Sequence, residues 1–229
     1  MTAPDPYFPS HGDSRYTVDH YDLALRYKIA TNRLRGRATL AVRALAPLTS
    51  LRVDLAGLEV DAVRIDGVRP RKVSHDARAI TIRPAEPLAA GATAELTIEY
   101  SGKPRPVPGT FGPAGWEELE DGVLVASQPY GAPSWFPCND FAGAKATFSF
   151  QVTAEAGYAV VANGVLTGRE RRGGNVTWSY SEARPMAPYL ATLHVGRYTT
   201  TPLATGRPCI DLVAPAHVQA AGTPFDRLP

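Results

Sequence analysis

The chain has 229 residues, of which 44% are hydrophobic and 20% charged, and its formal net charge is +2. This composition is typical of a globular protein with one large domain or two small ones, and the near-neutral charge argues against a nucleic-acid or membrane-surface binding protein. Two cysteines, Cys138 and Cys209, are too few for a disulfide framework, and no leader pattern or membrane-length apolar run is visible. We therefore expect a cytoplasmic protein with no nucleic-acid partner and no membrane partner.

The first half of the chain predicts β-strands that follow an irregular arm over residues 1–15. Apolar and polar residues alternate over 21–29 and again over 34–43, which is the pattern of strands with one buried face. Turn residues between the two segments predict a hairpin. Further alternating segments follow, with the turn pair Asp66–Gly67 among them, over residues 51–55, 58–66, 78–84 and 92–100.

The second half begins with a segment rich in Pro and Gly, residues 101–121, which predicts a long loop with solvated carboxylates. Short strands are then expected over 123–128, 146–154, 175–183, 189–200 and 209–215, and Asn163–Gly164 predicts a hairpin. Only residues 216–222 have helical character. Many short strands separated by turns predict an all-β protein, a large multi-stranded β-sandwich with almost no helix.

The histidines do not predict a metal site. The five are His11, His20, His75, His194 and His217, and none belongs to an HExxH motif or has a second histidine four residues away. Carboxylates gather only in the predicted loop, where Glu117, Glu118, Glu120 and Asp121 are expected to face solvent. We expect no metal ligand and no catalytic residue in this chain.

The segment SWFPCND, Ser134 to Asp140, places Cys138 among aromatic residues. Its thiol has four possible roles: nucleophile, metal ligand, half of a disulfide with Cys209, or buried packing group. An apolar setting raises a thiol pKa and disfavours the nucleophile. We favour a buried cysteine that packs with Trp135 and Phe136.

The longer segment from Ser127 to Val152 resembles the hallmark of the N-terminal domain in the aminopeptidase N family of zinc metallopeptidases. That pattern is a Gln or Glu on a strand, then FPC, one residue, Asp, and KA before an aromatic strand. The matching residues here are Gln128, Phe136, Pro137, Cys138, Asp140, Lys145, Ala146 and Phe148. YDLALRY near the start, ANG at 162–164, PMAPYL at 185–190 and the following VGRY also match, in order.

The resemblance implies a saddle-like N-terminal β domain over residues 16–202, with residues 203–229 forming a last strand and the start of a linker. In the family this domain packs on a catalytic domain whose zinc site uses an HExxH motif, and its zinc-activated water attacks the N-terminal peptide bond. This chain has no such motif. We expect it to be inactive alone, without cofactor, and to have its own catalytic domain and peptide N-termini as partners.

The resemblance also implies a substrate-binding role for Gln128, whose spacing before Cys138 matches the family residue that contacts the free α-amino group of the peptide. An amide oxygen can accept a hydrogen bond from an ammonium group. Tyr130 is expected to line the first specificity pocket, and Trp135, Phe136, Pro137, Cys138, Asp140 and Lys145 form the structural motif. The chain departs from the pattern in lacking an Arg before FPC and a Pro after Asp140.

Two other functions remain open from the residues alone. One is a stand-alone β-sandwich that binds protein or carbohydrate, which needs no second domain. The other is a cysteine-dependent enzyme that uses Cys138, which requires an accessible thiol. An exposed apolar face, of the kind that a second domain covers, favours the peptidase domain over the first of these.

Overall fold

The computed structural model describes residues 11–141, 143–201 and 212–215, and these residues form strands joined by turns and short 3-10 helices. The strands are β1 Tyr16–Lys28, β2 Arg33–Ala44, β3 Leu51–Asp54, β4 Glu59–Ile65, β5 Lys72–His75, β6 Ala79–Arg83, β7 Thr93–Gly102, β8 Gly115–Leu119, β9 Gly122–Ala126, β10 Ala146–Glu155, β11 Ala159–Ala162, β12 Val165–Arg172, β13 Asn175–Met186, β14 Leu193–Gly196, β15 Tyr198–Thr201 and β16 Leu212–Pro215. The 3-10 helices are η1 Ile29–Thr31, η2 Ala132–Ser134 and η3 Pro188–Leu190. Over these described ranges, no helix has the length and apolar character needed to cross a membrane.

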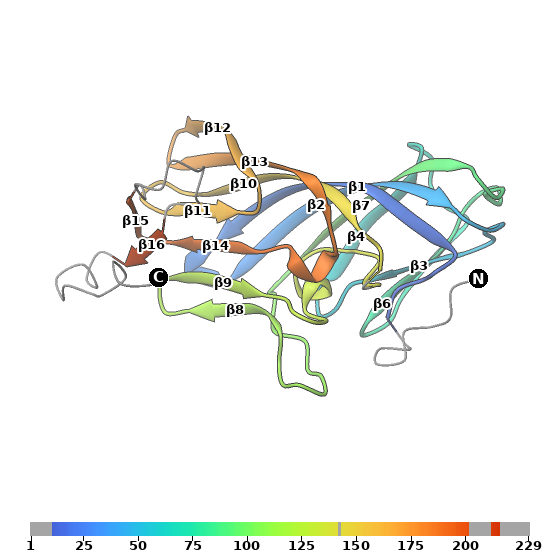
Figure 1. Cartoon of the computed structure of the whole chain (residues 1–229), viewed down its shortest axis with the longest axis horizontal. Coiled ribbons are helices and arrows are strands. Elements are labelled where there is room, and N and C mark those ends of the chain that lie inside the picture. Colours follow the sequence, from blue (N-terminus) through green and yellow to red (C-terminus); the bar gives the residue numbers. More distant parts are fainter. Residues whose placement is uncertain (1–10, 142, 202–211, 216–229) are drawn as a thin grey trace.

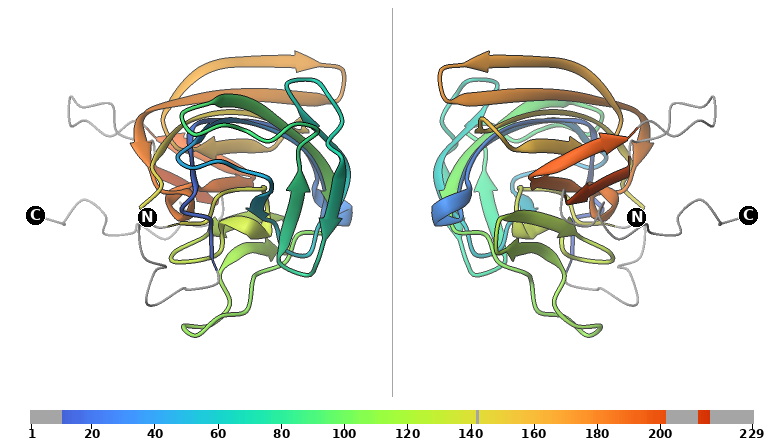
Figure 2. Two further views of the ribbon diagram at one scale, coloured as in Figure 1. Left: turned by 90° about the vertical axis from the view of Figure 1, so that its right-hand side faces the viewer. Right: turned by 90° about the vertical axis from the view of Figure 1, so that its left-hand side faces the viewer.

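The strands form a large sheet that covers smaller ones (Figure 1). Its seven strands have the order β12-β13-β10-β1-β2-β7-β4, with β1 and β10 parallel and the other neighbours antiparallel. A four-stranded sheet has the order β11-β14-β9-β8, a three-stranded sheet has the order β3-β6-β5, and β15 pairs with β16. Figure 2 shows the large sheet arching over the others. The prediction of an all-β sandwich is confirmed.

The long strands form because their side chains alternate between the core and the outer face. In β1, Tyr21, Leu23 and Leu25 are at most 3% exposed, whereas Arg26 is exposed. The same alternation continues in β2, β7 and β10, whose inner side chains belong to one hydrophobic core. The predicted hairpin of β1 and β2 is confirmed, and Asn32 closes it in the left-handed region with φ 45°.

The predicted loop over residues 101–121 is wrong in its second part, which forms β8 and pairs with β9. Trp116 anchors this strand, because its side chain has no exposed surface and its Nε1 donates a hydrogen bond to Asn32 Oδ1 at 3.0 Å. The other β8 residues from Glu117 to Leu119 are all exposed. The strand therefore lacks the alternation from which its neighbours were predicted. Strand β5 was not predicted either, and most of its side chains are exposed.

Three other predictions need correction. Asn163–Gly164 does not form a hairpin, because the strands on either side of it, β11 and β12, pair in different sheets. The single strand expected over 189–200 is divided into part of η3 and the strands β14 and β15. Asp66–Gly67 does form a tight turn, in which Ile65 and Val68 exchange two backbone hydrogen bonds of 2.9 Å, but the strands that flank it do not form a hairpin, because β4 pairs with β7 and β5 pairs with β6.

The C-terminal predictions are only partly covered by the described residues. Strand β16 lies within the strand expected over 209–215 and pairs with β15. Cys209, His217 and the helical segment expected over 216–222 lie outside the described residues. The division into an arm, a domain over 16–202 and a linker stays a prediction.

Candidate functional site

The segment SWFPCND lies inside the protein, between the large sheet and the smaller ones. All residues from Gly131 to Asp140 are buried. The Phe136 ring contacts Tyr21 of β1 edge-on, with ring centres 5.8 Å apart, and Trp135 edge-on at 4.6 Å. Burial of each ring stabilises the fold by about 2–3 kcal/mol. These rings fix the loop that follows β9 against the core.

The backbone of this segment continues the pairing of the three-stranded sheet. Asp54, the last residue of β3, donates its N–H to the carbonyl of Cys138 at 2.7 Å and accepts the N–H of Cys138 at 3.0 Å. The N–H of Ala56 donates to the carbonyl of Pro133 at 2.8 Å. The loop is therefore held by backbone hydrogen bonds at two points, which do not depend on its side chains.

Cys138 is enclosed by the fold. Its side chain has no exposed surface, and the cysteine is free within the described residues. Burial raises the pKa of the Cys138 thiol well above its ordinary value, and the carboxylates of Asp140 and Asp54 raise it further. A buried neutral thiol is a poor nucleophile. These features support the predicted packing role over the cysteine-enzyme hypothesis, and the packing role stays a prediction.

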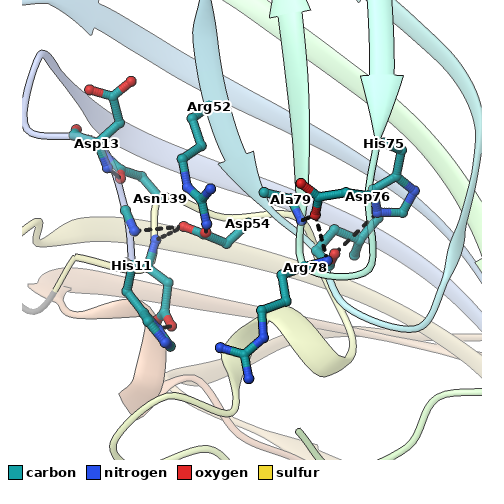
Figure 3. Close-up of polar contacts among 12 residues, drawn as sticks. His11, Asp13, Arg52, Asp54, His75, Asp76, Arg78, Ala79 and Asn139 are labelled. Carbon is teal, nitrogen blue, oxygen red and sulfur yellow. Dashed lines mark hydrogen bonds and ion pairs between the residues drawn. The ribbon is translucent and has the colours of Figure 1, made fainter. Parts of the chain in front are cut away.

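Asp54 connects three segments through its buried carboxylate (Figure 3). Oδ2 accepts hydrogen bonds from the backbone N–H groups of Gly12 at 2.9 Å and Asp140 at 3.2 Å. Oδ1 accepts a hydrogen bond from Arg52 Nη2 at 2.7 Å. Figure 3 shows Asp54 between Arg52 and the N-terminal segment. Because every partner is a donor, the buried charge is compensated.

Asn139 holds the same N-terminal segment from the other side. Its Oδ1 accepts the N–H of Asp13 at 2.7 Å, and its Nδ2 donates to the carbonyls of Asp13 and Tyr16, both at 3.1 Å. His11 Nδ1 lies 2.9 Å from Asp140 Oδ2. Residues 11–13 are thus joined to the motif by side-chain hydrogen bonds that span more than 120 positions of sequence.

Two carboxyl groups in this region have shifted pKa values. Burial raises the pKa of Asp140, and the hydrogen bond with His11 opposes this effect. Burial also acts to raise the pKa of Asp13, but the hydrogen bonds from the Arg15 side chain and backbone, together with its positive charge, hold that pKa below its ordinary value. Asp13 and Arg15 form an ion pair of 2.7 Å.

Gln128 lies two residues beyond β9 and its side chain is exposed. The chain turns immediately after it, since the N–H of Gly131 donates to the carbonyl of Ser127 at 2.6 Å. Residues 130–140, which follow closely, are buried and hold the backbone of this loop in place. The exposed Gln128 amide can therefore present its oxygen to a ligand from a fixed position. Its contact with a peptide stays a prediction.

Tyr130 is almost fully buried, with 2% of its surface exposed. Its hydroxyl accepts the N–H of Phe111 at 3.1 Å and donates to the carbonyl of Gly112. The ring occupies the space that a side chain at Gly109 would need. Tyr130 thus holds the segment before β8 against the loop that carries Gln128. The predicted role in a specificity pocket stays a prediction.

The other motif residues separate into two groups. Trp135, Phe136, Pro137, Cys138 and Asp140 are brought together in the interior, whereas Lys145, just before β10, is exposed. Within the described ranges, no three His, Cys, Asp or Glu side chains are placed to hold a metal ion.

Three residues that hold the site were not predicted from the sequence: Asp13, Asp54 and Asn139. Asp54 follows Val53 in a short alternating segment, and this pattern alone places it on the polar face. Asn139 lies inside the motif between Cys138 and Asp140, and this position was the one feature of the sequence that could have indicated its structural role. Their buried partners are distant in sequence, and only the folded structure brings them together.

Comparison with protein families gives one match, to the Peptidase M1 N-terminal domain, over residues 17–190. No curated protein matches the chain.

Among solved structures, an M1 zinc metallopeptidase from Deinococcus radiodurans matches with 32% identity and a TM-score of 0.81, over 88% of this chain and 47% of that one. A mutant of the Deinococcus radiodurans enzyme bound to a Tyr-Ser-Ala substrate matches with 31% identity and a TM-score of 0.81, over 90% and 49%. A two-domain M1 zinc metallopeptidase mutant bound to L-arginine has 31% identity and a TM-score of 0.82, over 90% and 49%. This chain spans about half the length of these relatives. The matched family profile covers most of the described fold, including the buried FPC segment, and the chain belongs to the family of peptidase M1 N-terminal domains.

Proposed function

We propose that this chain is the non-catalytic N-terminal domain of a zinc-dependent aminopeptidase, where it packs on a catalytic domain and helps to bind the free N-terminus of peptide substrates. One observation carries the proposal: the exposed Gln128 extends from a loop whose backbone is fixed by the buried FPC segment. The relatives that match the chain are M1 zinc metallopeptidases of about twice its length, and one of them is bound to a peptide.

The proposed contribution of this domain is to position the substrate. The described residues do not fit a zinc site, so no step at the metal is assigned to them. The Gln128 amide oxygen would accept a hydrogen bond from the peptide ammonium group. Since the rings of Trp135 and Phe136 fix the loop, that oxygen would be ordered before the substrate arrives, which lowers the entropic cost of binding.

The test uses the protein encoded when the reading frame is continued past Pro229. Its hydrolysis of unmodified peptides and of N-acetylated peptides is compared for wild type, Gln128→Ala and Gln128→Glu. Loss of one hydrogen bond to a charged group should raise KM for unmodified peptides about tenfold or more in Gln128→Ala. Gln128→Glu should keep a low KM, because its negative charge attracts the ammonium group.

The matched control is Glu59→Ala, which alters an exposed side chain on the large sheet. It should leave KM unchanged. The proposed contact is wrong if Gln128→Ala leaves KM unchanged, or if N-acetylated peptides suffer the same loss. If the longer protein shows no peptide hydrolysis, the peptidase role itself fails.

A further inference from the structure

The outer face of the large sheet has a hollow of about 800 Å³ that the peptidase role does not use. It lies over β1 and β2, which are neighbours near the middle of the large sheet (Figure 1). Its floor contains Ala24, whose side chain is small, and the backbone of Gly36, whose missing side chain would point to the core. Longer side chains on the neighbouring strands surround Ala24, so its small size contributes to the hollow.

One row of directly paired residues crosses this hollow. Beginning at β12, the row is Glu170, Thr177, Thr153, Arg26, Arg35 and Ser101. Directly paired residues on neighbouring strands point to the same face. Arg26 and Arg35 therefore lie opposite each other inside the row, and Arg37 lies two residues further along β2 on that face.

This central pair is unusual on electrostatic grounds. Like charges directly opposite on neighbouring strands destabilise a sheet. Ion pairs in the described part of the chain join carboxylates to Arg15, Arg43, Arg52, Arg172 and Arg197, and none joins one to Arg26, Arg35 or Arg37. The remaining arginine of the hollow, Arg172, is neutralised by Glu170.

The charges are arranged with a positive centre and negative margins. Glu170 lies at the β12 margin, while Asp61 lies at the β4 margin and accepts a hydrogen bond from Ser101. Glu99 is paired directly with Arg37 in the register of β2 and β7. A long anionic chain would meet these carboxylates at both ends, whereas a compact anion fits the centre alone.

Hydroxyl groups beside the arginines can add hydrogen bonds. Thr153 is paired with Arg26 and shares a 2.8 Å hydrogen bond with Thr177. Only one of these two hydroxyls donates to the other, so the second retains its proton for another acceptor. Guanidinium groups bind phosphate oxygens in a bidentate manner.

We propose that this hollow is a binding site for a compact multivalent oxyanion of the phosphate or diphosphate type, held by Arg26, Arg35 and Arg37. The anion would lie between the opposed guanidinium groups and remove their mutual repulsion. The site is independent of the role proposed for Gln128.

The test is calorimetric titration of the full chain with pyrophosphate and with inorganic phosphate at low ionic strength. Wild type should bind at one site, and Arg26→Gln and Arg35→Gln should each weaken binding about tenfold. Arg43→Gln is the matched control, because Arg43 lies on the same exposed face of β2 but is paired with Asp19. It should change the affinity by less than about twofold.

Thermal unfolding checks that the variants still fold. Without anion, Arg35→Gln should unfold at the wild-type temperature or above it, because a like-charge pair is removed. Pyrophosphate should raise the unfolding temperature of wild type more than that of Arg35→Gln. The proposal is overturned if pyrophosphate and phosphate both fail to bind, if Arg43→Gln weakens binding as much as Arg35→Gln, or if a glutamate-rich peptide binds there and pyrophosphate does not.

Discussion

The backbones of Asp54 and Cys138 pair as neighbouring strands do, although 84 positions separate them in the sequence. Each donates its N–H to the other's carbonyl, at 2.7 Å and 3.0 Å. This pairing joins the three-stranded sheet to the FPC segment, and the Asp54 carboxylate extends the connection to the N-terminal segment at Gly12. The loop that carries Gln128 is therefore supported from two directions.

Replacement of Asp54 should destabilise the protein. Asp54→Ala removes the acceptor for the N–H group of Gly12, which is partly buried, and for that of Asp140, which is buried. We expect the free energy of unfolding to fall by about 2–4 kcal/mol, since each buried unpaired donor is costly. Asp54→Asn keeps one acceptor oxygen and should lose less. Urea unfolding of both variants, with the exposed Glu117→Ala as control, measures the difference.

The role of Asp54 would be misassigned if Asp54→Ala unfolded at the same urea concentration as Glu117→Ala. A second outcome would also contradict it: equal losses in Asp54→Ala and Asp54→Asn would mean that the retained oxygen has no function. The slope of the transition should stay constant across the variants, because the surface exposed on unfolding is the same.

Cys138 should be inert to alkylation in the folded protein. Its thiol is buried and its pKa is raised, so both access and thiolate formation are disfavoured. In a Cys209→Ser background, iodoacetamide should modify Cys138 only after unfolding, which mass spectrometry detects. Cys138→Ala should lower the free energy of unfolding by about 1–2 kcal/mol through the cavity that it leaves.

The longer protein offers a second check on Cys138. Cys138→Ala should keep its turnover there, because the thiol packs and does not react. Rapid alkylation of the native protein, or loss of turnover in a variant that remains folded, would contradict the packing role.

Acid should weaken the fold in part through Asp13. The hydrogen bonds and charge of Arg15 hold the folded-state pKa of Asp13 below its ordinary value of about 4, so the folded state binds fewer protons than the unfolded state. Its stabilising contribution is complete above that pH and is lost as pH falls toward the folded-state pKa. Asp13→Asn should flatten the decline in stability over this range.

The matched variant for Asp13 is Arg15→Gln, which removes the group that lowers the pKa. It should flatten the same part of the curve while the carboxyl group is still present. Urea unfolding repeated from pH about 6 down to about 3 gives both curves. If Asp13→Asn follows the wild-type slope throughout, the acid sensitivity belongs to other groups.

Much of the fold follows from local patterns in the sequence. In β1, β2, β7 and β10 one face meets the core and the other meets water, so alternation of residue type reports the structure directly. Which strands pair with each other does not follow from these local patterns. Asn163–Gly164 has the composition of a hairpin turn, but the sheets that β11 and β12 join are decided by distant strands, β14 and β13.

The candidate site shows the same limit. The rings of Trp135 and Phe136 predicted a buried anchor because large apolar side chains are seldom exposed together. The buried carboxylate of Asp54 was unpredictable, since its two backbone donors lie 42 and 86 positions away. A carboxylate can be buried where several hydrogen-bond donors meet, and only the folded chain brings the donors to Asp54 together.

A last prediction concerns the close contact between Gly36 and Tyr100. They are paired on β2 and β7, and the Tyr100 ring occupies the space that a side chain at Gly36 would need. Both face a closed core, so Gly36→Ala should lower the free energy of unfolding by about 1–3 kcal/mol through overpacking. Tyr100→Leu added to Gly36→Ala should recover part of that loss, and chemical denaturation of the four chains gives the coupling energy.

Tyr100→Phe separates overpacking from hydrogen bonding. The Tyr100 hydroxyl is buried and no group in the described residues bonds to it, so its removal should leave stability unchanged or raise it. The ring keeps its size in this variant, and Gly36→Ala should remain as destabilising in the Phe background as in wild type. If Tyr100→Phe relieved the strain, the hydroxyl and not the ring would be responsible for the clash. If Gly36→Ala left the free energy of unfolding unchanged in every background, the overpacking prediction would be wrong. The paired strands β2 and β7 would then have room to move apart and accept the added methyl group.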